Sequence, residues 1–169
     1  YLALYCGGIA GKSYGNITKS YAVIDYNTNW RVYYLGGLVG FLDNNTIDEC
    51  YVINNYNIKN SEYTACHAIG GIVGYGYKSI IKNSFAVNLN TDNLIESIYE
   101  YNACSDATIE NCKTLLTMPD DYYEIVNNIG WDLSEWVIGY NSPLFLDDTY
   151  ITVTYKNITN ASTNKNHAA

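Results

Sequence analysis

Short apolar runs recur along the chain, separated from one another by glycine, asparagine, aspartate and serine. Four of these runs share one pattern and cover residues 17–23, 47–53, 81–87 and 109–115. An amphipathic helix needs apolar residues at i, i+3, i+4 and i+7 over about ten residues or more, and these runs are shorter. The pattern therefore predicts one β-strand per run, with a polar turn at 25–29 and a further strand at 30–34.

A glycine-rich hexapeptide precedes three of the four runs. It reads CGGIAG at 6–11, LGGLVG at 35–40 and IGGIVG at 69–74. The second glycines of successive pairs are 29 (37 − 8) and 34 (71 − 37) residues apart. A propeller blade needs about 40 residues or more, so these shorter repeats favour a β-solenoid. We expect the glycine pairs to form corners, where φ is positive or backbones approach closely.

Aligning the four runs predicts columns of side chains that stack from one repeat to the next. Strand side chains alternate between faces, so apolar and small columns are expected inside and an aromatic column outside, as an exposed stack. The inner columns are Ile17, Ile47, Ile81 and Ile109; Ser20, Cys50, Ser84 and Cys112; and Ala22, Val52, Ala86 and Thr114. The outer column is Tyr21, Tyr51, Phe85 and Lys113.

The two halves of this repeat resemble the GLUG repeat of secreted and surface proteins. Residues 36–40 (GGLVG) and 70–74 (GGIVG) match its glycine-rich half, while 81–86 and 109–112 match its I-x-N-C-Y-A-like half. The resemblance covers roughly residues 5–115. It implies an all-β fold, a β-solenoid (β-helix) of about three to four repeats.

Residues 116–147 have a different character. Acidic residues near the start of 118–126 predict a short helical turn there. Gly130-Trp131-Asp132, then Trp136-Val137-Ile138, resemble the segment that closes GLUG arrays, which implies an aromatic C-terminal cap over the last repeat. Such a cap would bury strand edges that an open end exposes.

Residues 148–169 are predicted to form an extended strand followed by a polar tail. The expected organisation is therefore a repeat region at 1–115, a cap at 116–147 and a tail at 148–169. Apolar and aromatic side chains of the tail strand are candidates for assembly with a neighbouring subunit, by addition to a sheet edge. They are Tyr150, Ile151, Val153 and Tyr155.

Composition supports a β fold with one core. Hydrophobic residues make up 48% of the chain, enough for one continuous core, and 19 tyrosines with only 2 prolines favour strands.

Charge and the length of apolar runs narrow the class of partner. The formal charge of −8 disfavours nucleic acid. No apolar run reaches the length of about 20 residues that spans a bilayer. Because the sequence starts at Tyr1 inside an apolar run, we expect a processed chain or a piece of a longer one.

The sequence offers little catalytic chemistry. It contains neither C-x-x-C nor H-E-x-x-H, and its two histidines, His67 and His167, are far apart. The adjacent Cys66 and His67 would point to opposite faces of a strand. The acidic pairs 120–121 and 147–148 leave glycoside hydrolysis open, although paired turn carboxylates are typically solvated. We therefore predict no enzyme, cofactor or metal site.

The cysteines cannot all pair with one another within the chain. Their count of five is odd. Cys50 and Cys112 share a column but lie two repeats apart, about 9.6 Å, which exceeds the Cα separation of about 7 Å that a disulfide tolerates. We expect no bond between them.

Extracellular exposure is suggested by four N-x-S/T sequons, at Asn16, Asn44, Asn157 and Asn160. The predicted function is a non-enzymatic extracellular structural or adhesive module, a subunit of a surface fibre or filament joined end to end. The alternative is a carbohydrate- or protein-binding module of a larger surface adhesin or secreted peptidase. In that case the exposed aromatic column (Tyr21, Tyr51, Phe85) would contact a glycan or a host surface protein.

Overall fold

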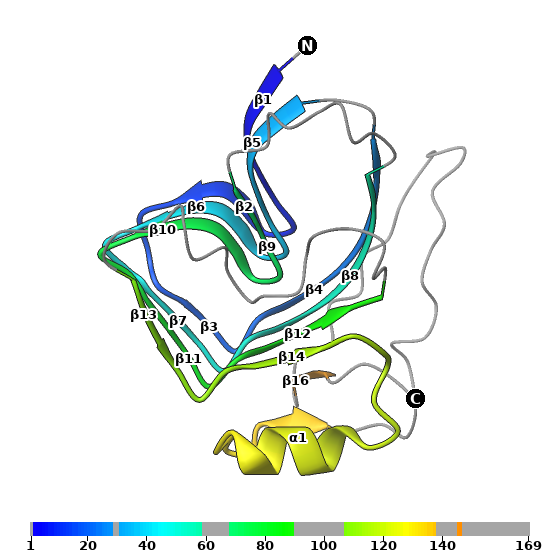
Figure 1. Cartoon of the computed structure of the whole chain (residues 1–169). Helices are drawn as coiled ribbons and strands as arrows, with labels where there is room; N and C mark the ends of the chain where they lie inside the picture. The colour runs from blue at the N-terminus through cyan, green and yellow to red at the C-terminus, as the bar shows by residue number, and fades with distance from the viewer. Residues whose placement is uncertain (1, 29–30, 59–67, 90–106, 138–144, 147–169) are drawn as a thin grey trace, which may run out of the picture.

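The structure is mostly β and built from parallel sheets. It is a computed structural model that describes residues 2–28, 31–58, 68–89, 107–137 and 145–146. Four parallel sheets, which we name A to D, are followed by one helix and a small antiparallel sheet, E. The chain passes through sheets A, B, C and D in that order three times, and then through C and D once more (Figure 1).

Each parallel sheet collects one strand from each passage of the chain. Sheet A contains β1 (Leu2–Gly7), β5 (Arg31–Gly36) and β9 (Ala68–Gly70). Sheet B contains β2 (Ala10–Ser13), β6 (Val39–Asp43) and β10 (Val73–Tyr77). Sheet C contains β3 (Ile17–Thr18), β7 (Thr46–Asp48), β11 (Ile80–Lys82) and β13 (Thr108–Glu110). Sheet D contains β4 (Tyr21–Thr28), β8 (Tyr51–Ile58), β12 (Phe85–Asn88) and β14 (Lys113–Leu115).

We call the strands of one passage a layer. The first layer is β1–β4, the second β5–β8, the third β9–β12, and the fourth consists of β13 and β14 among the described residues. Strands of one sheet lie behind one another in Figure 1, so the layers are seen almost end on. Every backbone ladder within sheets A to D therefore joins residues one repeat apart.

The predicted columns are confirmed residue by residue. In sheet C, Ile17 pairs with Ile47, Ile47 with Ile81, and Ile81 with Ile109. In sheet D the same offsets pair Ala22, Val52, Ala86 and Thr114 in turn. Register is specified this strongly because a one-residue slip would turn every apolar side chain to the wrong face.

The main core lies between the sheets. Leu38, Leu42, Ile47, Ile72 and Ile81 are fully buried there. The predicted inward columns contribute to it, since Cys50, Val52 and Ala86 belong to the same cluster. Stacked aliphatic side chains of successive layers thus form a continuous interior.

The turn between sheets C and D breaks each predicted run into two strands. Residues 17–23, predicted as one strand, form β3 and the start of β4, with Lys19 at φ 47° between them. The equivalent residues of the next layers, Glu49, Asn83 and Asn111, also have positive φ. The prediction of one strand per run was wrong because alternation alone does not reveal a single left-handed residue.

A short side chain stabilises each of these corners from the next position. Ser20 Oγ donates to the Thr18 carbonyl at 2.8 Å, and Ser84 Oγ donates to the Lys82 carbonyl at 2.7 Å. The Cys50 and Cys112 thiols make the same bond, each at 3.2 Å. Such a local side chain to backbone bond favours a turn over continued strand. The predicted column of Ser20, Cys50, Ser84 and Cys112 is therefore a column of hydrogen-bond donors.

The glycine pairs lie at the bend between sheets A and B, as predicted, but not because of positive φ. Among the described glycines only Gly130 has positive φ. A Cβ on Gly37 would lie 2.0 Å from the Gly71 carbonyl oxygen, and one on Gly8 would lie 2.6 Å from the Gly37 carbonyl oxygen. Close approach between layers is what requires glycine here.

The polar segment at 25–29 was wrongly predicted to be a turn. Up to Thr28 it is the second half of β4, which pairs with β8 as far as Thr28 and Ile58. The strand predicted at 30–34 is confirmed in substance as β5. Pairing with a parallel neighbour overrides the weak strand propensity of aspartate and asparagine.

The C-terminal segment packs beside the layers. Helix α1 (Tyr122–Asn128) is capped by Asp121, whose carboxylate accepts from the Tyr123 amide, and it confirms the predicted helical turn. Sheet E consists of β15 (Trp136–Val137) and β16 (Phe145–Leu146). The described residues of this segment cover the outer face of sheet D (Figure 1), and the last layer keeps an exposed Ile109, 44% accessible. The expected cover over the last repeat is corrected to a lateral one.

Neighbouring isoleucines on β11 give a direct test of the interior. We expect Ile81→Ala to lower the free energy of unfolding by about 2–5 kcal/mol, because it removes a fully buried member of the aliphatic column. Ile80→Ala is the matched control, since that side chain is 39% exposed and should cost far less. Urea unfolding followed by circular dichroism measures both. Equal losses would contradict the assignment of faces.

Candidate functional site

The aromatic column stacks as predicted but is not an exposed surface. The Tyr21 and Tyr51 rings lie 5.1 Å apart and nearly parallel, and the Tyr51 and Phe85 rings lie 5.2 Å apart. Tyr51 and Phe85 are 0% exposed and Tyr21 is half-buried. The prediction that this column is exposed was therefore wrong, although the residues do point away from the main core.

Aromatic side chains of the C-terminal segment cover this column. The Trp131 ring lies 5.7 Å from Phe85, and the Trp136 ring lies 6.1 Å from Tyr51. Tyr122 of α1 packs against Phe85 at 6.3 Å. Together with Ile125 and Val126 they form a second core on the outer face of sheet D. Sequence alternation identified the face but not its cover, which comes from residues much later in the chain.

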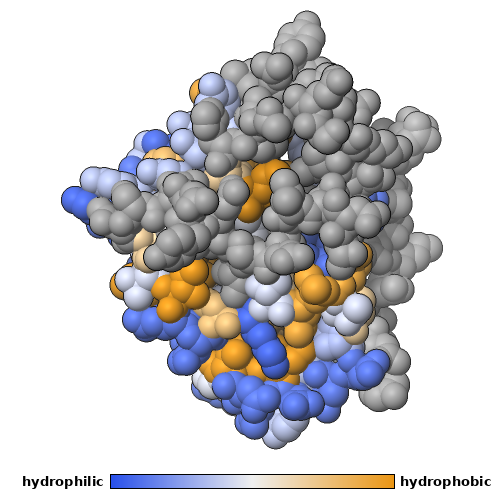
Figure 2. Space-filling model, viewed as in Figure 1, coloured by the Kyte–Doolittle hydropathy of each residue, from blue (hydrophilic) through white to orange (hydrophobic). Residues whose placement is uncertain are grey.

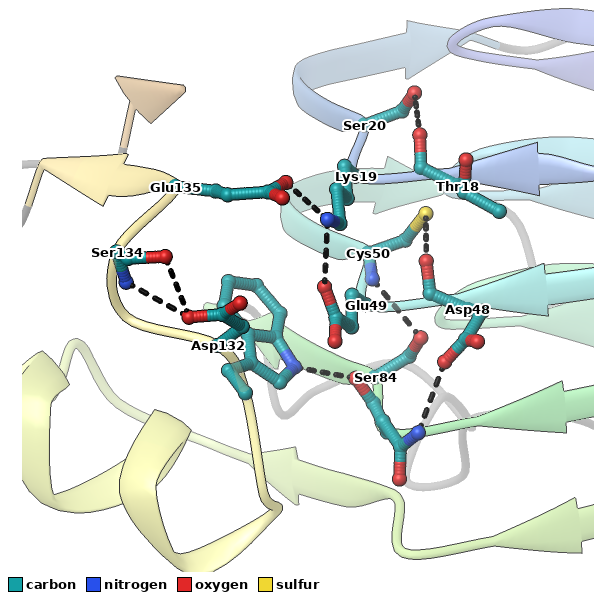
Figure 3. A network of polar contacts seen from close by, with 12 residues as sticks. Thr18, Lys19, Ser20, Asp48, Glu49, Cys50, Ser84, Asp132, Ser134 and Glu135 are labelled. Carbon is teal, nitrogen blue, oxygen red and sulfur yellow. Dashed lines mark hydrogen bonds and ion pairs between the residues drawn. The ribbon is translucent and has the colours of Figure 1, made fainter. Parts of the chain in front are cut away.

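Polar contacts at the C–D corner also join the C-terminal segment to the layers (Figure 3). The Lys19 ammonium donates to the Glu135 carboxylate, and Lys19 Nζ lies 3.8 Å from Glu49 Oε2. The Trp131 indole N–H donates to the Asn83 carbonyl. Three successive corner residues thus face the same stretch, 131–135.

Burial and hydrogen bonding both shift the pKa values of charged groups at this corner. Burial raises the pKa of the Glu49 carboxyl, against the opposing influence of Lys19, and Glu49 Oε2 has no hydrogen-bond partner. The hydrogen bond to Glu135 raises the pKa of the Lys19 ammonium. Hydrogen bonds from Ser134 lower the pKa of the Asp132 carboxyl. The arrangement is an ion-paired contact between segments, and its charged groups are engaged with one another.

The thiols of the corner column are structural. Cys50 and Cys112 are not joined by a disulfide, as expected. Burial raises the pKa of the Cys50 thiol from 9.0 to about 12 and also raises that of Cys112. A nucleophilic cysteine needs a lowered pKa, so the chemistry of these two thiols is the opposite of an activated site. Cys66 and Cys104 lie outside the described residues.

A second aromatic cluster, which the sequence did not reveal, lies where side chains of sheets A and B meet across their bend. We call it the A–B aromatic cluster. Its rings interleave at centroid distances of 4.9 Å for Tyr34 and Tyr75, 5.1 Å for Phe41 and Tyr75, and 5.5 Å for Tyr5 and Phe41. All four rings are half-buried. The signal was present in the register, which aligns Tyr5 with Tyr34 and Phe41 with Tyr75.

A cation sits over this cluster. Lys12 Nζ lies 4.4 Å from the Phe41 ring centroid and 5.7 Å from that of Tyr5. It also lies 4.6 Å from the centroid of Tyr14, whose ring is 69% exposed. Aromatic faces under a lysine and open at one side are suited to planar or sugar ligands and to protein contacts.

Other predicted site residues fall in two groups. The sequon residues Asn16 and Asn44 are exposed, and Asn44 occupies a corner with positive φ. Asn157 and Asn160, both histidines and the tail residues Tyr150, Ile151, Val153 and Tyr155 lie outside the described residues. Of the acidic pair at 120–121, Asp121 caps α1.

In the described part of the chain, no three histidine, cysteine, aspartate or glutamate side chains come together as a metal site would require. Its helix is too short to cross a membrane.

Comparison of the chain with models of protein families, with curated proteins and with solved structures gave no match.

The burial of the Cys50 thiol can be tested by substitution. We expect Cys50→Ser to fold normally, because Ser20 and Ser84 already make the same carbonyl bond in this column. A thiol reagent should titrate equal numbers of cysteines in both native proteins, and one fewer in the unfolded variant.

The alkaline stability of the two proteins should also differ. The folded chain keeps the Cys50 proton up to about pH 12, whereas the unfolded thiol ionises near pH 9.0. The wild-type chain therefore loses stability relative to Cys50→Ser as pH rises from about 9 towards 12. A native thiol count that falls by one in the variant would contradict the burial of Cys50.

Proposed function

We propose that the chain is a β-solenoid of the GLUG type, serving as a non-enzymatic structural or adhesive module outside the cell. The observation that supports this most directly is the in-register stacking of parallel layers, with every C–D corner built alike. A rod of this kind has long covered sides and two ends that present strand edges. Such a rod is suited to linking other protein modules across a distance.

The contrast between sides and ends supports assembly end to end. On one side, the C-terminal segment covers sheet D with tryptophan, tyrosine and isoleucine side chains. At the first layer, Leu4, Ile9 and Val23 are 52%, 45% and 60% exposed. Strand edges that carry exposed apolar side chains favour pairing with another chain. We propose that such pairing builds a surface fibre and that residues 148–169 add a further strand to it.

Electron microscopy tests this proposal. We expect the purified chain to form linear particles of varying length, and the chain truncated after residue 147 to form shorter ones, because it lacks the tail strand. The measurement is the particle length distribution at matched concentration. Uniform single particles in both samples would refute end-to-end assembly.

A binding role is the second candidate, and the A–B aromatic cluster favours it. Partly exposed tyrosine rings with an adjacent cation can pack against a sugar face. In this role the chain is the carbohydrate- or protein-binding module of a larger surface protein. Tyr14 offers the most accessible ring, and Lys12 would hydrogen-bond hydroxyl groups beside it.

A glycan array distinguishes this candidate. If it is right, Tyr14→Ala and Lys12→Ala should each weaken binding by about tenfold or more, the loss of roughly one good contact. Tyr123→Ala is the matched control, because Tyr123 is 53% exposed but belongs to α1. Equal binding by all the variants, or none by the parent chain, would remove the candidate.

A further inference from the structure

We propose that the edge of β3 and β4 in one copy of the chain pairs in register with the edge of β13 and β14 in a second copy. This inference rests on the proposed end-to-end assembly and names the two surfaces that meet. In sheets C and D, β3 and β4 are the edge strands at one end and β13 and β14 at the other, among the described residues. Each edge is parallel to its inner neighbours.

The register of the proposed junction is fixed by the layers that already exist. The offset that pairs β3 with β7 also pairs β4 with β8, and the same holds for each later step. Sheets C and D therefore advance together as a unit. A second copy placed beside the fourth layer would continue both sheets at once, with Ile17 beside Ile109.

Apolar side chains would meet apolar side chains at this junction. Ile109 is 44% exposed, and its counterpart Ile17 is half-buried at the opposite end of the same column. Val23, 60% exposed, would lie beside Leu115. Figure 2 has the same viewpoint as Figure 1, almost end on to the layers, and shows apolar surface over sheets C and D. Burial of these side chains would stabilise the pair.

Charges do not oppose the junction. Glu110 would lie beside Thr18, and Asn111 beside Lys19. Lys113 would lie beside Tyr21. Like charges directly opposite one another destabilise a strand pair, and this register produces none between β3–β4 and β13–β14.

The corner column carries an alternation that the junction would continue. Along the layers it reads Ser20, Cys50, Ser84, Cys112, and the Cys50 amide donates to Ser84 Oγ of the next layer at 3.1 Å. With a second copy in place, the Cys112 amide would face Ser20 Oγ in the same relation. A hydroxyl accepts this bond better than a thiol, so the serine at the start suits the cysteine at the end.

The partner is therefore a second copy of this chain, joined head to tail. The two surfaces differ, so the contact is heterologous and repeats without closing. Each copy offers one edge and receives the other. This property allows a test with two variants that are each blocked at a different end.

Val23→Lys should block the first-layer edge, and Ile109→Lys should block the fourth-layer edge. Both side chains are about half exposed, so lysine can reach solvent in the single chain without unfolding it. In sedimentation velocity we expect the wild-type chain to form a concentration-dependent series of oligomers. Each variant alone should associate at least about tenfold more weakly, because it has one working edge and no edge to meet it.

The mixture is the decisive sample. Equimolar Val23→Lys and Ile109→Lys should form a dimer and nothing larger, because the intact fourth layer of one meets the intact first layer of the other. Val137→Lys and Ile80→Lys are matched controls, 48% and 39% exposed at positions away from both edges, and should assemble like the wild type. Circular dichroism confirms that all variants are folded.

The outcomes separate this inference from the function on which it rests. A wild-type chain that stays monomeric overturns both. Wild-type oligomers with unaffected variants overturn the junction and leave end-to-end assembly through another surface, such as residues 148–169. Variants that fail alone and also in the mixture overturn the head-to-tail arrangement.

Discussion

The fold depends on a corner made by one left-handed residue and the short side chain that follows it. All six non-glycine residues with positive φ in the described part are followed by a residue whose side chain donates to the carbonyl two positions back. A left-handed residue costs roughly 1–2 kcal/mol when it is not glycine. The local bond offsets that cost, and because each corner turns alike, the strands beyond it fall into register. Without superimposed corners, sheets C and D could not advance together.

The sequence predicted the columns because similar residue types recur at equivalent positions of each repeat. These equivalent positions pair with one another in the sheets, so the recurrence also predicts the register. The sequence did not predict Lys19, Glu49, Asn83 and Asn111 as left-handed. Asparagine adopts this conformation readily but lysine and glutamate do not, and the shared signal is the short side chain at the next position. The sequence also placed the aromatic column correctly while missing its burial. Tyr51 faces away from the main core, but only the packing of Trp136, distant in sequence, removes it from solvent. Long-range cover of this kind leaves little local pattern.

One local sign of that cover was available in β8. Its first four residues, Tyr51 to Asn54, are all buried, so the strand is covered on both faces. A parallel strand buried on both sides reads as a continuous apolar run, whereas a half-exposed strand alternates with charged residues. Tyrosine obscured the distinction because it suits either environment. The A–B aromatic cluster was missed for a related reason, since its rings come from two sheets and meet only after the glycine bend.

Buried amides in the middle layers explain why the ends differ from the interior. Asn54 Nδ2 donates to Asn88 Oδ1 at 2.9 Å and to the Gly71 carbonyl at 2.8 Å. Such a pair fixes register, because a slipped layer would leave buried amides without partners. The same column holds Ile24 in the first layer and Leu116 just after β14. Amides therefore pair only inside the stack, and aliphatic side chains stand at both ends. At the proposed junction this column would place Ile24 beside Leu116, so no buried amide would be left without its partner there. The aliphatic ends of this column are therefore compatible with the interior that the junction extends.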